Sequence, residues 1–208
     1  MPPKRQVKSK QRVADFGEVF TAPREVNAML DLVASEFERV DATFLDPACG
    51  DGNFLVEILR RKLAYVEDVS KTDAEYERNA LIALASIYGI EIQDDNAREC
   101  RTRLLKIWRE AYGGKMGEKG SDVARENARI IIDLNIVRGD FLTMRTVDES
   151  SRDTKKSIYT YAWSFDGETL VGNPEKLQPP QSSTLFDYQH GNELPEVVRL
   201  PNVGNINN

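Results

Sequence analysis

Hydrophobic positions along this chain alternate between short apolar runs and stripes with helical spacing, a pattern typical of α/β proteins. Short apolar runs predict three strands, one ending at Phe44-Leu45 and two more at residues 86–92 and 135–138. Helical stripes predict a helix capped by Thr21 with Pro23 in its first turn, and further helices at residues 53–66, 73–85 and 95–112 and after Ser121. Strands that alternate with helices in this way favour a doubly wound sheet.

The rest of the chain is less regular. The Gly-rich residues 113–120 predict a flexible connector, and the polar residues 143–157 predict a loop. Residues 158–163 and 169–172 alternate as two strands around a turn at residues 165–168. Residues 175–208 are rich in Pro, Gln, Ser and Asn, which predicts an irregular or partly disordered tail. We therefore expect a basic tail at 1–16, one domain at 17–174 and an irregular tail at 175–208.

The loop at residues 46–52, DPACGDG, joins the first strand to the helix that begins at Asn53. Gly50 and Gly52 allow positive φ angles and let a ligand approach the backbone. The loop has neither the Lys-Ser/Thr of a phosphate-binding loop nor the third glycine of a dinucleotide-binding loop. Its two carboxylates, Asp46 and Asp51, suit a cationic ligand.

The nine residues DPACGDGNF resemble the first motif of S-adenosylmethionine-dependent DNA adenine methyltransferases, D-P-x-x-G-x-G-x-F. YGIEI, at the second strand, and GDFL, after the third, resemble the second and third motifs of the same family. FTAP, at the start of the first helix, resembles the aromatic-Thr-Pro turn that precedes the glycine loop, with Ala22 inserted. This order of motifs is similar to that of type I restriction-modification methylation subunits. The resemblance covers residues 17–142.

The resemblance implies a Rossmann-like methyltransferase fold, with the C-terminal part truncated or irregular, that uses S-adenosylmethionine as its cofactor. It implies that Glu91 accepts the ribose hydroxyl hydrogens and that Asp140 accepts the adenine amine, while Phe141 packs on the ring. The aromatic-Thr-Pro turn would touch the methionine part. Asp46, Glu91 and Asp140 are expected to line the carboxyl edge of the sheet. The cofactor-binding residues implied are Phe20, Thr21, Asp46, Pro47, Ala48, Gly50, Gly52, Asn53, Phe54, Glu91, Ile92, Asp140 and Phe141.

Members of this family carry Asn/Asp-Pro-Pro-Tyr/Phe at the end of the fourth strand. There an amide oxygen and a backbone carbonyl accept the two hydrogens of the target amine, and the aromatic residue stacks on the flipped base. This chain has Asn173-Pro174-Glu175-Lys176, which implies Asn173 and Pro174 as catalytic residues. Lys176 has no stacking face and only 34 residues follow Pro174, so we expect weak or no DNA methylation without a partner.

Three alternatives remain open at this point. Asn-Pro is also a common turn dipeptide, in which case the fourth strand lies at residues 158–163. The chain could be a non-catalytic S-adenosylmethionine-binding subunit of a restriction or antiphage assembly, with a specificity or nuclease subunit as its partner. It could also methylate an amine in RNA or protein.

Composition narrows these choices. Two cysteines and one histidine exclude a four-ligand zinc site of the usual kind, and no metal is expected. There is no apolar run of membrane-spanning length and no signal peptide, so we expect a cytoplasmic protein without a membrane partner. The net charge of −6 argues against a self-sufficient DNA-binding protein. The exception is a basic stretch that either contacts phosphates or aids solubility: Lys4, Arg5, Lys8, Lys10 and Arg12.

Overall fold

The centre of the molecule is a five-stranded mixed sheet with strand order β1-β2-β3-β4-β5. The computed structural model describes residues 11, 20–148, 150, 152–177 and 195–200. Three strands are parallel: β1 (Phe44–Asp46), β2 (Ile87–Glu91) and β3 (Ile136–Asp140). The other two are antiparallel: β4 (Arg145–Val147) and β5 (Asp153–Ser157). All five residues of β2 are buried, as expected for the middle of a parallel sheet.

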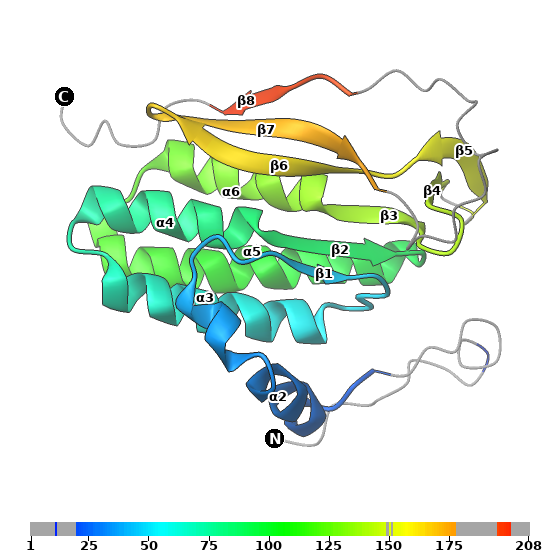
Figure 1. The fold of residues 1–208 in the computed structure, drawn as a ribbon, viewed down its shortest axis with the longest axis horizontal. Helices are drawn as coiled ribbons and strands as arrows, with labels where there is room; N and C mark the ends of the chain where they lie inside the picture. Colours follow the sequence, from blue (N-terminus) through cyan, green and yellow to red (C-terminus); the bar gives the residue numbers. More distant parts are fainter. Residues whose placement is uncertain (1–10, 12–19, 149, 151, 178–194, 201–208) are drawn as a thin grey trace.

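Helices precede β1 and connect the parallel strands. They are α2 (Pro23–Asp31), α3 (Asn53–Val69), α4 (Asp73–Ala85), α5 (Asp94–Met116) and α6 (Asp122–Asn135), with short 3-10 turns η1 (Ala34–Glu38) and η2 (Gly117–Lys119). In Figure 1, α3 and α5 lie beneath the strands, while α4 and α6 lead directly into β2 and β3. Thr72 and Ser121 cap α4 and α6 by accepting hydrogen bonds from backbone N–H groups at 3.1 and 3.3 Å.

A second, antiparallel sheet lies over the opposite face (Figure 1). It consists of β6 (Tyr159–Asp166), β7 (Thr169–Lys176) and β8 (Val198–Leu200). Two aromatic polar groups attach it to the main sheet and α6. The Tyr88 hydroxyl donates to the Tyr161 carbonyl at 2.6 Å, and the Trp163 indole donates to Asn135 Oδ1 at 2.9 Å. Burial of Leu170 completes the same core.

These elements confirm the predicted α/β, Rossmann-like fold class, and the predicted strands and helices up to β3 are present within a few residues. Two predictions at helix ends were wrong. Ala22, not Thr21, occupies the cap position of α2, and no side chain caps this helix. The Gly-rich connector is partly helical, because Tyr112 and Met116 are buried and hold Gly113 and Gly114 within α5.

Residues 143–157 are not a loop but contain β4 and β5. Met144 and Val147 are buried, and the polar side chains pair across the strands, as when the hydroxyls of Thr146 and Thr154 lie 2.6 Å apart. A polar sequence therefore forms strands here because cross-strand contacts satisfy its side chains.

The predicted hairpin at residues 158–172 is present and longer than expected. Its turn contains Gly167, with φ of +61°, and Asn173-Pro174 lies inside β7. The interpretation of this dipeptide as a turn was therefore wrong. Pro174 lies beyond the stretch of β7 that pairs with β8, where a missing N–H donor is tolerated. Within the predicted irregular tail, Glu175 and Lys176 belong to β7, and Val198–Leu200 form β8.

The basic segment, Lys4 to Arg12, lies outside the described residues apart from Gln11, as do residues 178–194 and 201–208 of the predicted tail. Within the described part of the chain, no helix is long and apolar enough to cross a membrane.

Candidate functional site

Three acidic residues end the three parallel strands. Asp46 is the last residue of β1, Glu91 of β2 and Asp140 of β3. Because these strands are neighbours and run in the same direction, their last residues meet at one edge of the sheet, at the right in Figure 1. The acids therefore line the carboxyl edge, where open α/β sheets bind their ligands.

The glycine loop is fastened to this edge by Glu91. The buried carboxylate of Glu91, 7% exposed, accepts the Gly50 N–H at 2.8 Å and the Gln93 N–H at 2.7 Å. Cys49 N–H adds a bond to the Ile90 carbonyl at 3.0 Å. Glu91 thus organises the loop in addition to any contact with a ligand.

The two loop glycines are required for different reasons. Both have positive φ, +53° at Gly50 and +86° at Gly52. A Cβ on Gly50 would lie 3.1 Å from the Phe20 ring, whereas a Cβ on Gly52 would lie 2.7 Å from Cys100 Sγ on α5. The close approach of α5 is therefore a further reason for glycine at position 52, and the role of Gly52 in admitting a ligand stays a prediction. Nearby, a hydrogen bond to Cys100 and burial raise the pKa of the Cys49 thiol well above its usual range.

The two carboxylates of the loop have different environments. Asp46 is half-buried and accepts the Ala48 N–H at 3.2 Å. Burial raises the pKa of Asp46, and the Ala48 N–H partly offsets that rise. Asp51 is only 4% exposed and its Oδ1 lies 2.9 Å from Arg103 Nη1. Asp51 is thus paired within the protein, so the prediction that it also serves a cationic ligand was wrong.

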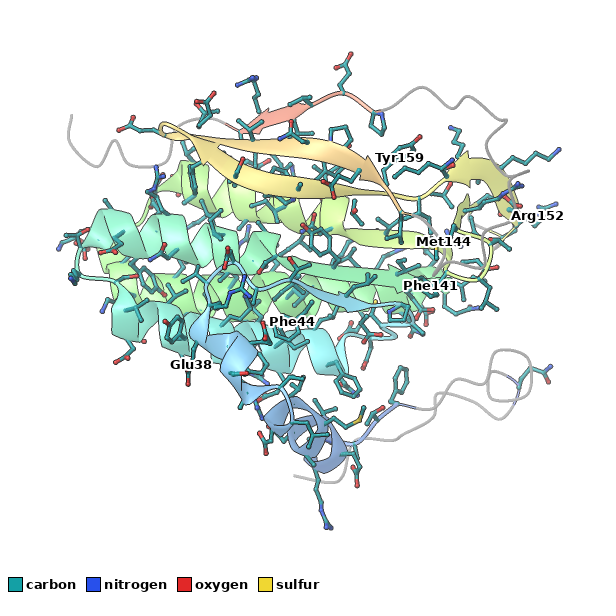
Figure 2. All side chains as sticks on the ribbon, viewed as in Figure 1. Glu38, Phe44, Phe141, Met144, Arg152 and Tyr159 are labelled. Carbon is teal, nitrogen blue, oxygen red and sulfur yellow. The ribbon has the colours of Figure 1, made fainter. Side chains whose placement is uncertain are left out.

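Apolar side chains adjoin the third acid. Asp140 Oδ1 accepts the Leu142 N–H at 2.8 Å, and Leu142 is 91% exposed. Phe141 is half-buried and lies at the same end of the molecule as Met144 (Figure 2). An acceptor beside exposed apolar surface suits a flat ring that carries an amino group.

The turn before α2 lies directly against the glycine loop. The Phe20 ring packs on Gly50, and the Thr21 carbonyl accepts a hydrogen bond from Asn53 Nδ2 at 3.1 Å. Asn53 Oδ1 in turn accepts from Arg103 Nη2 at 3.0 Å. Sequence reasoning placed Phe20, Thr21 and Asn53 at the site but missed Arg103. The available indication was Asp51 itself, since a buried carboxylate requires a cation.

Comparison with known families supports the resemblance to DNA methyltransferases. The MmeI DNA-methyltransferase domain matches this chain over residues 21–177. The chain belongs to that family. No curated protein and no solved structure matches this chain. The matched range includes the glycine loop, the three acids and Asn173-Pro174 of this methyltransferase domain.

The motif that contains Asn173 lies within β7, on the second sheet. In Figure 1, β7 runs in the same direction as β2. Asn173 is exposed and pairs with Ala162 of β6, and Pro174 pairs with Tyr161. The methyltransferase domain thus carries this motif on an antiparallel strand, so the catalytic role of Asn173 and Pro174 stays a prediction.

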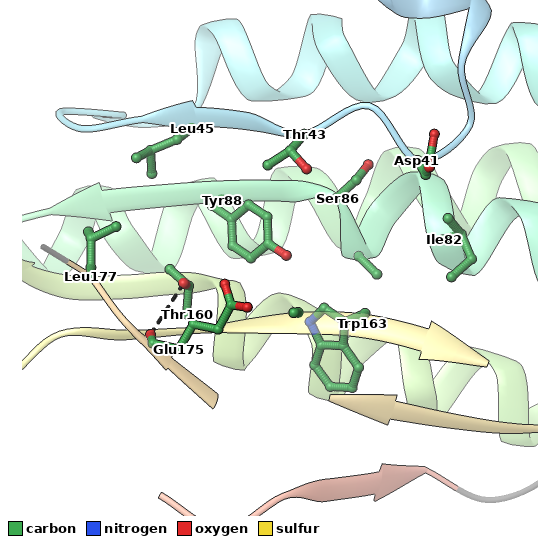
Figure 3. A pocket seen from close by; sticks show the side chains of 12 residues that line it. Asp41, Thr43, Leu45, Ile82, Ser86, Tyr88, Thr160, Trp163, Glu175 and Leu177 are labelled. Atoms are coloured by element: carbon green, nitrogen blue, oxygen red, sulfur yellow. Dashed lines mark hydrogen bonds between the residues drawn. The ribbon is translucent and has the colours of Figure 1, made fainter. Parts of the chain in front are cut away.

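A cleft of about 340 Å³ separates β1 and β2 from the hairpin (Figure 3). Leu45 and Tyr88 line it from the main sheet, and Thr160, Glu175 and Leu177 line it from β6 and the end of β7. The residues that follow Asn173 therefore face the strand that ends at Asp46.

Proposed function

We propose that this domain binds S-adenosylmethionine at the carboxyl edge and transfers its methyl group to an adenine amino group in DNA. The observation that carries the proposal is the convergence of Asp46, Glu91 and Asp140 on one edge, around a glycine loop held by Glu91. Membership of the MmeI DNA-methyltransferase domain family supplies the reaction class. When bound, the cofactor supplies a methyl group activated by its sulfonium.

The methionine and ribose parts of the cofactor suit Asp46 and Glu91. The half-buried carboxylate of Asp46 stabilises a cationic group, and the cofactor carries both a sulfonium and an ammonium. Glu91 ends β2 beside the loop, and we assign its carboxylate, which also accepts the Gly50 and Gln93 N–H groups, to the ribose hydroxyls.

The adenine part suits the end of β3. Asp140 offers acceptor oxygens for the exocyclic amine, and Phe141 with the exposed Leu142 offers apolar surface for the ring. Transfer of a flat ring from water onto such a surface is favourable because it buries apolar area on both partners.

The target amine is a weak nucleophile because its lone pair is delocalised into the base. Asn173 Oδ1 and the Pro174 carbonyl would accept its hydrogens and support the charge that develops during in-line attack. Lys176 offers no stacking face, which costs about 1–3 kcal/mol of base–aromatic stacking. We therefore propose that DNA contacts come from a specificity or nuclease subunit of a restriction-modification system.

Calorimetry on the purified chain tests the cofactor site. Wild type should bind S-adenosylmethionine and its demethylated product, and Asp140→Asn should weaken binding. The matched control is Asp133→Asn, an exposed acid of α6 paired with Arg129, which should leave the affinity unchanged. Absence of cofactor binding to folded wild type would contradict the proposal.

Methyl transfer tests the reaction. Labelled cofactor should transfer its methyl group to unmethylated DNA when a partner subunit is added, and the product base should be N6-methyladenine. Transfer to RNA or protein but not to DNA would refute the assignment of the substrate.

A further inference from the structure

We propose that Arg103 is a positioning residue that holds the glycine loop and, through Asn53, the turn at Phe20-Thr21 in the geometry that receives the cofactor. The role of this arrangement in cofactor affinity rests on the function proposed above. The arrangement itself is a property of the chain and is testable without any ligand.

One guanidinium serves three acceptors. Arg103 Nη1 lies 2.9 Å from Asp51 Oδ1 and 2.5 Å from the Asp51 carbonyl oxygen, and Nη2 lies 3.0 Å from Asn53 Oδ1. Arg103 is on α5, 52 residues from Asp51, and its side chain is only 23% exposed. The planar fork of arginine can make these contacts together, whereas the single ammonium of lysine cannot match their geometry.

Asn53 extends the arrangement to the turn before α2. Its amide oxygen accepts from Arg103 while its amide nitrogen donates to the Thr21 carbonyl at 3.1 Å. These two partners fix the amide orientation, because a flipped amide would place its NH₂ group against the guanidinium. Phe20, which precedes Thr21, packs its ring on Gly50. The turn is therefore fastened to the loop at two points.

This arrangement should affect cofactor binding more than folding. Gly50 and Gly52 are conformationally permissive, and β1, which precedes them, has only three residues, so the loop depends on side-chain contacts for its order. A loop that is ordered before the ligand arrives gives higher affinity than one that must be ordered on binding. Arg103 supplies that order by neutralising the buried Asp51 and by directing Asn53 toward Thr21.

Hydrogen exchange without cofactor tests the arrangement directly. Arg103→Gln should speed exchange in peptides that cover residues 20–27 and 46–54. Arg103→Lys keeps a charge near Asp51, so it should speed exchange mainly at residues 20–27. Lys106→Met is the matched control, since Lys106 is an exposed cation of α5 that pairs with Glu110 at 3.8 Å. Wild-type exchange at both segments in both Arg103 variants would overturn the proposal.

Calorimetry tests the consequence for the cofactor. Arg103→Gln should weaken S-adenosylmethionine binding by at least about tenfold, since it removes several bonds to a charged donor. Adding Asp51→Asn should restore part of the affinity, because the buried charge is then gone; a purely structural defect would not be rescued. If wild type binds the cofactor and the Arg103 variants bind it equally well, the inference is wrong. If wild type does not bind it, the proposed function fails, while hydrogen exchange still decides the role of Arg103.

Discussion

Replacing Glu91 with Gln should loosen the glycine loop even before a ligand is added. The Glu91 carboxylate accepts backbone N–H groups on both oxygens, from Gly50 at 2.8 Å and from Gln93 at 2.7 Å. A glutamine has the same shape but only one acceptor oxygen, so one of the two N–H groups would face an NH₂ group. The variant therefore changes hydrogen bonding at nearly constant volume.

The magnitude follows from these contacts. A hydrogen bond to a charged group contributes about 1.5–3 kcal/mol to stability. A neutral amide costs less to bury than a carboxylate, which offsets part of the loss. We expect the free energy of unfolding to fall by about 1–2 kcal/mol. Loss of a ribose acceptor should weaken cofactor binding further, by about tenfold for each 1.4 kcal/mol.

Urea denaturation and calorimetry measure the two effects separately. Glu99→Gln is the matched control, because Glu99 is an exposed acid of α5 close in sequence to Glu91. A Glu91→Gln protein with wild-type stability and wild-type cofactor affinity would refute the role of Glu91 in both loop order and binding. Lower stability with unchanged affinity would leave only the role in the loop.

Three further predictions concern stability and turnover. Burial lowers the pKa of Lys62 to about 8, so the unfolded chain holds more protons between pH 8 and the ordinary lysine pKa of 10.5. Urea denaturation should show the free energy of unfolding rising with pH in that range, by up to about 1.4 kcal/mol per pH unit, and Lys62→Met should remove the rise. Gly52→Ala should lower the free energy of unfolding, measured by thermal denaturation, by about 2–4 kcal/mol. Adding Cys100→Ala should recover part of that loss, because it makes room for the new Cβ. Independent, additive losses from the two substitutions would contradict this packing argument. Asn173→Ala should abolish methyl transfer while changing stability by less than about 0.5 kcal/mol and sparing cofactor affinity, since Asn173 is exposed; retained activity would show that the chemistry lies elsewhere.

Local sequence was sufficient for the elements whose causes lie within a few residues. The helical stripes predicted α4 and α6, and the hydroxyl of Ser121 predicted the start of α6, because a cap and its helix are adjacent in the chain. The positions of Glu91 and Asp140 at strand ends were predicted for the same reason. The apolar run and the acid that follows it are one local pattern.

Tertiary structure decided the features that depend on distant residues. Asp51 looks like a ligand group in the sequence, but its environment is set by Arg103, which is 52 residues away. Gly52 likewise owes its identity to Cys100 on another helix. Residues 143–157 have no apolar alternation that predicts strands, and they form β4 and β5 because β3 offers an edge to pair with. Burial, charge pairing and strand edges are properties of the packed chain, so a window of sequence determines the motif while the fold determines which of its residues face the ligand.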